Sequence, residues 1–323
     1  MPPPGFLNLT IDPDADPEDL GNEHLTVSKL IENIQAKNIK DTEKIEKIKD
    51  LCLKVNENIH HTGDRSFILD VLENGKQISA HHRRPFFSAG LTGQDIFGTL
   101  YVFLHKNEII KITICDCNQS ISEYDIVREI AMQKYASTLQ ETCNFKVPLI
   151  KNYGKIVLST DKGNNCLYYF TMENISGKTL RQYLTIIDLD KTCTPLITKI
   201  NEIYSCLIEN NLFHNDYTSN NLIVDDKDMY VIDYGISTPI QEYFNTDDQF
   251  SCDDLKDEKA NYVAYEESNK EYKKAIDEIS EDELKHLITL LTPEKPKGGS
   301  PRKRRRTKKY YRKNKNTKTR RKK

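Results

Sequence analysis

The residues between 214 and 235 have the types and spacing that phosphoryl transfer requires. His214 and Asp216 are followed by Asn221, and Asp233-Tyr-Gly235 closes the segment. Phosphoryl transfer needs a carboxylate that accepts a hydroxyl proton and hard oxygen ligands that hold Mg²⁺ against the phosphates. Asp216 suits the first task, and Asn221 and Asp233 suit the second. The structural alternative is a turn that uses these side chains only for capping.

Two short apolar stretches must position this cluster. Residues 222–224 and 229–232 are joined by the polar residues 225–228, a pattern that predicts a β-hairpin. Asn221 precedes the first strand and Asp233 follows the second. We therefore expect the hairpin to bring these two side chains together at one of its ends.

A third apolar stretch, residues 108–114, contains a single lysine. Burying Lys111 in such a strand is costly unless the ammonium group is paired with an acid. The expected partner is Glu129, which lies 18 residues further on in a helix predicted from about residue 121 to residue 136. The alternative is an exposed lysine near an unrelated helix glutamate.

Two further segments complete a recognisable order. Upstream of Lys111, a glycine-containing loop leads into a predicted strand, and its notable residues are Gly93, Asp95, Phe97, Gly98 and Leu100. Downstream, a predicted strand ends at Met172-Glu173 and is followed by Asn-Ile175-Ser-Gly. Together these motifs resemble the protein-kinase-like superfamily over about residues 86–240. The similarity is nearer to compact atypical members, such as the RIO-type kinases and the kinase of the KEOPS complex.

The resemblance implies a role for each matching residue, with ATP and Mg²⁺ as cofactors. Lys111 would hold the α- and β-phosphates and Glu129 would fix Lys111. Asp216 would be the catalytic base, His214 would support its loop, and Asn221 and Asp233 would bind the metal. The ATP-binding residues would be Gly93, Asp95, Phe97, Gly98 and Leu100 over the phosphates, and Met172, Glu173 and Ile175 at the adenine.

The chain also departs from the family pattern. Asp95 replaces the central glycine of the phosphate loop, which adds bulk and negative charge where phosphate would lie. Asn215 stands where the usual arginine would be, and Thr218 replaces the usual lysine. No Ala-Pro-Glu motif follows Gly235, and about 57 residues separate Gly235 from a Pro/Gly-rich linker. The predicted substrate lobe is therefore short, and it names no substrate.

Four functions are compatible with these observations. The first is an active serine/threonine protein kinase of compact type, acting on a protein substrate. The second is a pseudokinase scaffold that binds ATP without using it, as Asp95 and the short substrate lobe would allow. The third is a nucleic-acid-binding protein that acts through its tail. The fourth is a small-molecule kinase of the aminoglycoside or choline type, although those usually lack the glycine present at Gly235.

The expected fold class is α+β, with a bilobal kinase-like domain between two extensions. A small β-rich N-lobe with one helix would precede a mostly helical, shortened C-lobe. Two amphipathic helices within residues 26–60 would pack on this domain or dock a protein partner. The predicted organisation is a disordered acidic, Pro-rich segment over 1–22, a helical extension over 23–85, an N-lobe over 86–173, a C-lobe over 174–292 and a disordered basic tail over 293–323.

Charge is distributed very unevenly. Residues 295–323 carry 17 Lys and Arg and no acid, which leaves 30 basic and 49 acidic side chains elsewhere, a balance of −19. Such a tail could bind nucleic acid or another polyanion, direct nuclear import, or fold back on the acidic body. The linker and the Lys/Arg/Asn-rich run are similar in style to proteins of large DNA viruses.

Composition also bears on the compartment. No apolar run approaches the roughly 20 residues that cross a bilayer, and residues 1–5 do not resemble a signal peptide. The eight cysteines form no CxxC pair, so we expect reduced, mostly buried thiols. The predicted location is therefore intracellular, in the cytoplasm or nucleus, without membrane attachment.

Overall fold

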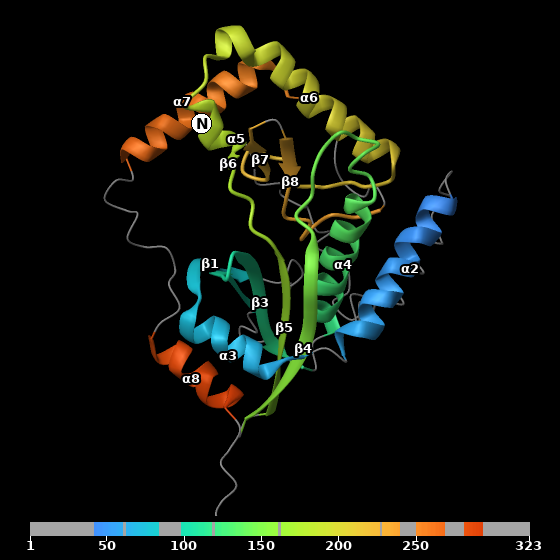
Figure 1. The fold of residues 1–323 in the computed structure, drawn as a ribbon, viewed down its shortest axis with the longest axis vertical. Helices are drawn as coiled ribbons and strands as arrows, with labels where there is room; N and C mark the ends of the chain where they lie inside the picture. Colours follow the sequence, from blue (N-terminus) through green and yellow to red (C-terminus); the bar gives the residue numbers. More distant parts are fainter. Residues whose placement is uncertain are drawn as a thin grey trace, which may run out of the picture.

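The computed structural model describes residues 42–60, 63–83, 98–117, 120–160, 163–226, 228–239, 250–268 and 281–292. Within these ranges the chain is a mixed α+β protein with seven helices, a five-stranded antiparallel sheet and a three-stranded sheet (Figure 1). The predictions for residues 1–22, for the helix within 26–41, for Gly93, Asp95 and Phe97, and for the tail over 293–323 lie outside the described residues.

The five-stranded sheet has the order β1-β2-β3-β5-β4, and every neighbouring pair is antiparallel. Its strands are β1 (Lys76–Arg83), β2 (Gly98–His105), β3 (Glu108–Asp116), β4 (Ile150–Thr160) and β5 (Gly163–Glu173). Lys111 lies opposite Val102 on β2 and Phe170 on β5, so it occupies the central strand of the sheet. Because side chains alternate along a strand, Lys111 and Ile110 point to opposite faces.

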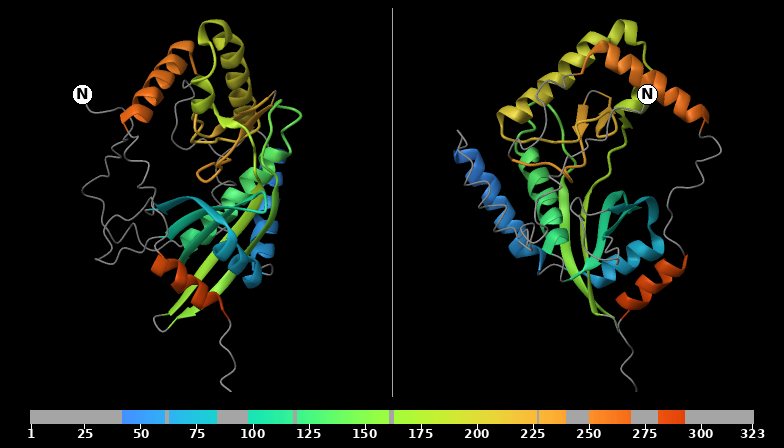
Figure 2. Two further views of the ribbon diagram at one scale, coloured as in Figure 1. Left: turned by 60° about the vertical axis from the view of Figure 1, so that its left-hand side comes forward. Right: turned by 180° about the vertical axis from the view of Figure 1, so that it is seen from behind.

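Helices cover both faces of this sheet (Figures 1 and 2). On the face of Ile110, the helices α3 (Arg65–Asn74) and α8 (Glu281–Leu291) pack through apolar side chains such as Ile68 and Leu287. On the face of Lys111 lies α4 (Ser120–Ser137). Each face of the sheet therefore packs against its own apolar cluster.

The helix α2 (Thr42–Ile59) packs along the outer side of α4 (Figure 1). Its spacing of three and four residues between apolar positions predicts a single buried stripe, and this prediction is confirmed. The buried residues of the stripe are Ile45, Ile48, Cys52, Val55 and Ile59.

The remaining elements form a second part of the molecule, which carries the 214–235 cluster (Figure 1). They are β6 (Lys178–Thr179), α5 (Leu180–Leu184), α6 (Leu189–Glu209), β7 (Leu222–Asp225), β8 (Asp228–Val231) and α7 (Cys252–Ser268). The predicted hairpin is confirmed, because β7 and β8 pair from Leu222 opposite Val231 to Asp225 opposite Asp228. The order of this small sheet is β6-β7-β8.

Two elements pack elsewhere than expected from the sequence. The extension predicted over 23–85 was expected to be helical, but β1 lies within it and pairs with β2. This strand is largely polar and lies at the edge of the sheet, where Ile78 is 42% exposed, so it lacks a clear alternating pattern. The helix α8 was expected in the C-lobe over 174–292, but its buried Leu287 and Leu291 pack with α3 and the five-stranded sheet.

The prediction of reduced thiols is also wrong for six of the eight cysteines. The structure pairs Cys117 with Cys166, Cys143 with Cys206, and Cys193 with Cys252, at Cα–Cα distances of 4.8, 5.5 and 5.8 Å. Partners 49 to 63 residues apart are brought together only by the fold, so sequence spacing gave no sign of them. Cys52 and Cys115 are buried thiols. The cysteines therefore no longer support a reducing compartment. No helix within the described ranges is long and apolar enough to cross a membrane.

Candidate functional site

The site begins with Lys111, whose ammonium group contacts two carboxylates. Its Nζ lies 2.6 Å from Oε1 of Glu129 on α4 and 2.7 Å from Oδ1 of Asp233, which follows β8. Lys111 is 8% exposed and Glu129 is fully buried. The predicted pairing with Glu129 is confirmed, and the fold adds a second acid that lies 122 residues away in the sequence.

These three charges influence each other strongly, because the ammonium group of Lys111 and the Glu129 carboxylate are buried and lie within 2.7 Å of their partners. Burial acts to lower the pKa of Lys111, but the charges of Glu129 and Asp233, and their hydrogen bonds, raise it above its ordinary value. The lysine is therefore a cation at neutral pH. One cation between two carboxylates leaves a net negative charge, which favours the approach of a divalent metal ion.

The loop after α6 places Asp216 and Asn221 in direct contact. The Asn221 Nδ2 atom donates to Oδ2 of Asp216 at 2.7 Å and to its backbone oxygen at 2.9 Å. The backbone of Asn221 also donates to the carbonyl of Thr218 at 3.0 Å. Asn221 thus closes the loop on itself and holds the Asp216 carboxylate in one orientation.

His214 joins this loop to the segment that carries Asp233. Its Nε2 atom donates to the backbone oxygen of Ile232 at 2.9 Å, and its ring lies 5.0 Å from the ring of Tyr234. Burial lowers the pKa of His214, whereas the hydrogen bond to Ile232 and the charges of Asp233 and Asp216 oppose that shift. A neutral imidazole here ties the loop to the segment before Asp233 without adding charge.

Two residues of the site have an unusual backbone conformation. Asp233 and Asn215 both have a φ of 62°, a left-handed conformation that Asn and Asp tolerate better than most residues. The Asn215 side chain donates to the carbonyl of Ile236 at 2.9 Å and to Oγ1 of Thr238 at 3.1 Å. Asn215 therefore ties the loop to the segment after Gly235.

The helix α4 also fixes that segment. Arg128, the neighbour of Glu129, donates from Nη2 to the carbonyl of Gly235 at 2.7 Å. Adjacent residues of one helix thus hold Lys111 on one side and the Asp233-Tyr-Gly235 turn on the other.

The described residues predicted to bind ATP lie at the edges of this arrangement. Leu100 on β2 is buried, and its register opposite Thr113 places it on the same face of the sheet as Lys111. Met172 and Glu173 end β5, and the backbone of Glu173 donates to the carbonyl of Leu149 at 3.2 Å. Gly98 opens β2. Ile175 is half-buried in the connection to β6.

That connection passes very close to β7 at Gly177. A Cβ atom at this position would lie 2.5 Å from the carbonyl oxygen of Val224 and 2.6 Å from a side-chain carbon of Ile223. Only a residue without a side chain fits against β7 at this point, immediately before β6 pairs with β7. The close approach joins the connection after β5 to the hairpin that follows Asn221.

One member of the site was missed by sequence reasoning. Among the acids at the start of α7, Asp254 accepts from the backbone and hydroxyl of Ser251 at 2.8 and 2.6 Å. Glu258 instead accepts from Oγ of Ser219, inside the loop, at 2.7 Å. The only available signal was helical spacing, because Leu255 is buried and residues three and four positions later share its face.

The donor atoms suit Mg²⁺. The amide nitrogen of Asn221 is bound to Asp216, which leaves its oxygen as an acceptor, and the Asp233 side chain is 44% exposed. Carboxylate and amide oxygens are hard ligands of the kind that Mg²⁺ prefers, together with water and phosphate. Within the described ranges no group of three or more His, Cys, Asp and Glu side chains is placed to hold a metal ion. Water or phosphate oxygens would have to complete the coordination of any Mg²⁺ bound here.

Comparisons with known proteins add no family assignment. No protein-family model matches this chain, and no curated protein shows significant similarity to it.

Proposed function

We propose that this chain is an ATP- and Mg²⁺-dependent phosphotransferase, a serine/threonine protein kinase of compact atypical type. The observation that carries the proposal is the contact of Lys111 with both Glu129 and Asp233. Three residues chosen from the sequence for separate roles meet at one point, beside the loop that holds Asp216 and Asn221. If the short motifs resembled a kinase by accident, Lys111, Glu129 and Asp233 would have no reason to contact one another.

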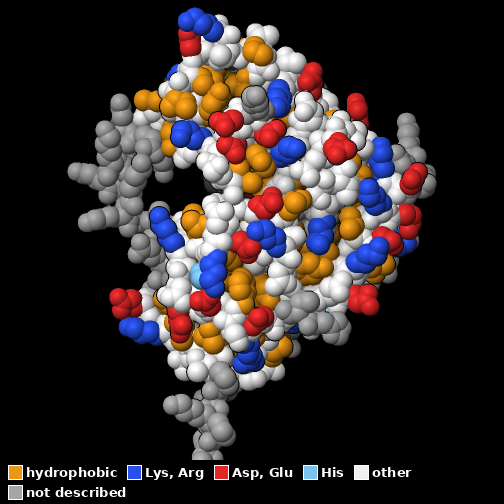
Figure 3. Space-filling view, viewed as in Figure 1, with side chains coloured by type: hydrophobic (Ala, Val, Ile, Leu, Met, Phe, Trp, Pro, Cys, Tyr) orange, Lys and Arg blue, Asp and Glu red, His pale blue; other side chains and the backbone are white. Residues whose placement is uncertain are grey.

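We further propose that the two parts of the molecule correspond to the two lobes of a protein-kinase-like fold. The five-stranded sheet with α4 would be the N-lobe, and the part with α5, α6 and α7 would be a shortened C-lobe. Figure 3 shows the surface hollowed between these two parts. ATP would lie in that hollow, with its adenine near Met172 to Ile175 and its phosphates near Lys111.

In this proposal the protein side chains position the reactants. The Lys111 ammonium would turn from Asp233 toward the α- and β-phosphates, while Glu129 holds its other side. Asp216 would orient the substrate hydroxyl and accept its proton at a carboxylate oxygen, because Asn221 fixes that carboxylate. Mg²⁺, when bound by Asn221 and Asp233, would neutralise charge on the transferring phosphates.

Transfer of labelled phosphate from ATP tests the proposal. The purified chain with Mg²⁺ would be given generic protein substrates, and choline and aminoglycosides would be offered separately. We expect Asp216→Asn to lower protein phosphorylation by roughly 100-fold or more. The matched control is Asp226→Asn, which removes an exposed carboxylate from the β7–β8 turn and should retain full activity.

The alternatives give different results. A wild-type chain that binds ATP in calorimetry but transfers no more phosphate than Asp216→Asn would be a scaffold. Label appearing only on choline or an aminoglycoside would indicate a small-molecule kinase. Equal activity of Asp216→Asn, Asp226→Asn and the wild type would refute the catalytic assignment.

A further inference from the structure

The helix α7 packs across α5 and α6 at the far end of the molecule from α3 and α8 (Figures 1 and 2). Several contacts fix it there. Leu255 is fully buried, and Lys259 donates to the carbonyl of Ile187 at 2.9 Å. Just before the helix, Phe250 exchanges two hydrogen bonds with the Asn201 side chain, at 2.9 and 3.0 Å.

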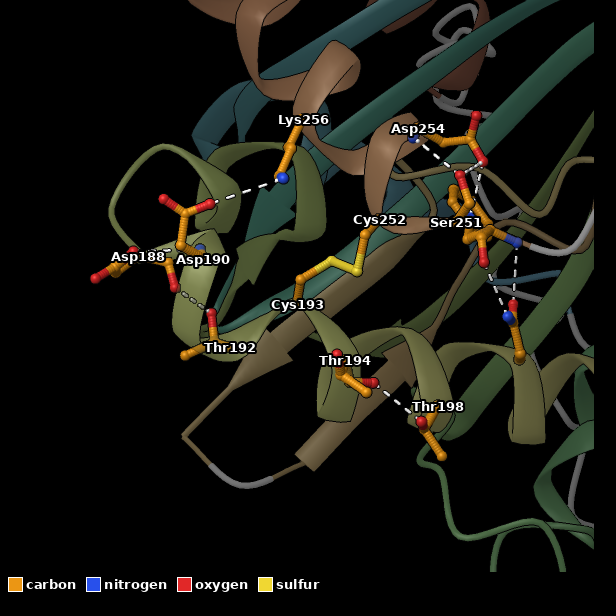
Figure 4. The surroundings of a disulfide bond; sticks show 12 residues. Asp188, Asp190, Thr192, Cys193, Thr194, Thr198, Ser251, Cys252, Asp254 and Lys256 are labelled. Atoms are coloured by element: carbon orange, nitrogen blue, oxygen red, sulfur yellow. Dashed lines mark hydrogen bonds and ion pairs between the residues drawn. A yellow bond between two sulfur atoms is a disulfide. The ribbon is translucent and has the colours of Figure 1, made fainter.

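The first residue of α7 is also joined covalently to α6. Figure 4 shows the Cys193–Cys252 disulfide between the two helices, with the Ser251–Asp254 cap on one side and the Lys256–Asp190 ion pair on the other. The start of α7 is thus held against α6 by a bond that does not depend on packing. The position of every residue one or two turns further along is correspondingly restricted.

Two turns into the helix, Glu258 contacts the loop between Asp216 and Asn221. Its Oε1 atom accepts from Oγ of Ser219 at 2.7 Å. The same oxygen lies 3.1 Å from Nε of Arg181 on α5.

A backbone hydrogen bond between Arg181 and Ser219 completes a closed set of contacts among Glu258, Ser219 and Arg181. The amide nitrogen of Arg181 donates to the carbonyl of Ser219 at 3.1 Å, and the guanidinium of Arg181 lies 5.1 Å from the ring centre of Tyr262. Ser219 is 3% exposed and is therefore held from its side chain and from its carbonyl. A loop residue held through both its side chain and its carbonyl has little freedom to move.

We propose that Glu258 is a positioning residue for the loop that carries Asp216. Ser219 lies three residues after Asp216 and two before Asn221, so its anchor determines where both side chains meet the substrate. The inference rests on the phosphotransferase function proposed above. Because small displacements of a catalytic group lower reaction rates strongly, loss of this anchor should lower kcat more than it weakens nucleotide binding.

The test compares Glu258→Ala with Asp257→Ala, which removes an exposed carboxylate from the neighbouring position of the same helix. We expect Glu258→Ala to lower kcat by roughly 10- to 100-fold while the KM for ATP changes by less than about twofold. Asp257→Ala should leave both constants unchanged. The conservative variant Glu258→Gln retains an oxygen acceptor for Ser219 and should recover part of kcat.

Hydrogen exchange supplies a readout that does not depend on activity. Amides of residues 214–221 should exchange faster in Glu258→Ala than in the wild type, and at the wild-type rate in Asp257→Ala. Faster exchange in a chain that transfers no phosphate would uphold the anchor and refute the proposed function. Unchanged exchange and unchanged kcat in a folded Glu258→Ala would refute the anchor alone. If that variant does not fold, Ser219→Ala provides the same comparison from the other partner.

Discussion

Replacing Glu129 by glutamine removes one charge from the buried contact with Lys111 and changes little else in shape. Glu129 is fully buried and its carboxylate lies 2.6 Å from the lysine. Breaking a buried ion pair costs about 3–5 kcal/mol, because the remaining charge keeps its desolvation penalty. Asp233 remains as a second counter-charge at 2.7 Å, so the lower end of that range applies. We therefore expect the free energy of unfolding to fall by about 3 kcal/mol.

Urea unfolding measured by circular dichroism gives that quantity. Glu141→Gln, at an exposed position after α4, is the matched control and should change the free energy of unfolding by less than about 0.5 kcal/mol. The midpoint should shift at constant slope if only stability changes. A Glu129→Gln chain as stable as the control would show that the buried pair is not formed. It would also refute the candidate site, which depends on that pair.

The same contact predicts how stability depends on pH. The pKa of Lys111 is raised in the folded chain, so it binds its proton more tightly when folded than when unfolded. The resulting stabilisation is complete below the ordinary lysine pKa, and it is lost as the pH rises toward and through the raised value. The difference in stability between wild type and Glu129→Gln should therefore be constant near neutrality and shrink only in strongly alkaline solution.

Three further predictions concern other parts of the fold. Burial raises the pKa of the Cys52 thiol to about 12, so iodoacetamide at pH 8 should label it only in denaturant. Rapid labelling of Cys52 in the native chain would contradict its place on the buried face of α2. The double variant Cys193→Ala/Cys252→Ala should have a free energy of unfolding about 2–4 kcal/mol below that of the oxidised wild type. As the control, the two chains should be equally stable after reduction. Gly177→Ala should cost about 1–3 kcal/mol by overpacking against Val224, whereas the neighbouring exposed Ser176→Ala should be nearly neutral in the same urea assay. A neutral Gly177→Ala would show that the chain does not approach β7 there.

Local sequence patterns were sufficient to predict part of the fold and part of the site. The stripe from Ile45 to Ile59 and the β7–β8 hairpin follow from periodicity and turn residues, which act over a few positions. The pairing of Lys111 with Glu129 follows from the cost of burying an isolated charge. In each case the physical requirement can be recognised from residues that are close in the sequence.

Other features depend on contacts between distant segments and have no local sign. The strand β1 is an edge strand with an exposed Ile78, so its sequence need not alternate. The disulfide partners and the Glu258–Ser219 contact arise from how segments that are distant in the sequence pack together. Glu258 is one of several acids on α7, and only the position of Leu255 on the same face distinguishes it.

The return of α8 to the far face of the sheet has a consequence for the order of folding. The cluster around Ile110 includes residues of α3 and of α8, which come from near the two ends of the described chain. During synthesis on the ribosome, the sheet emerges long before its last covering helix. Until residues 281–292 have been translated, an apolar surface of β2, β3 and β5 remains incompletely covered and able to aggregate. Chains truncated before α8 should therefore accumulate in the insoluble fraction, even though every strand of the sheet is present.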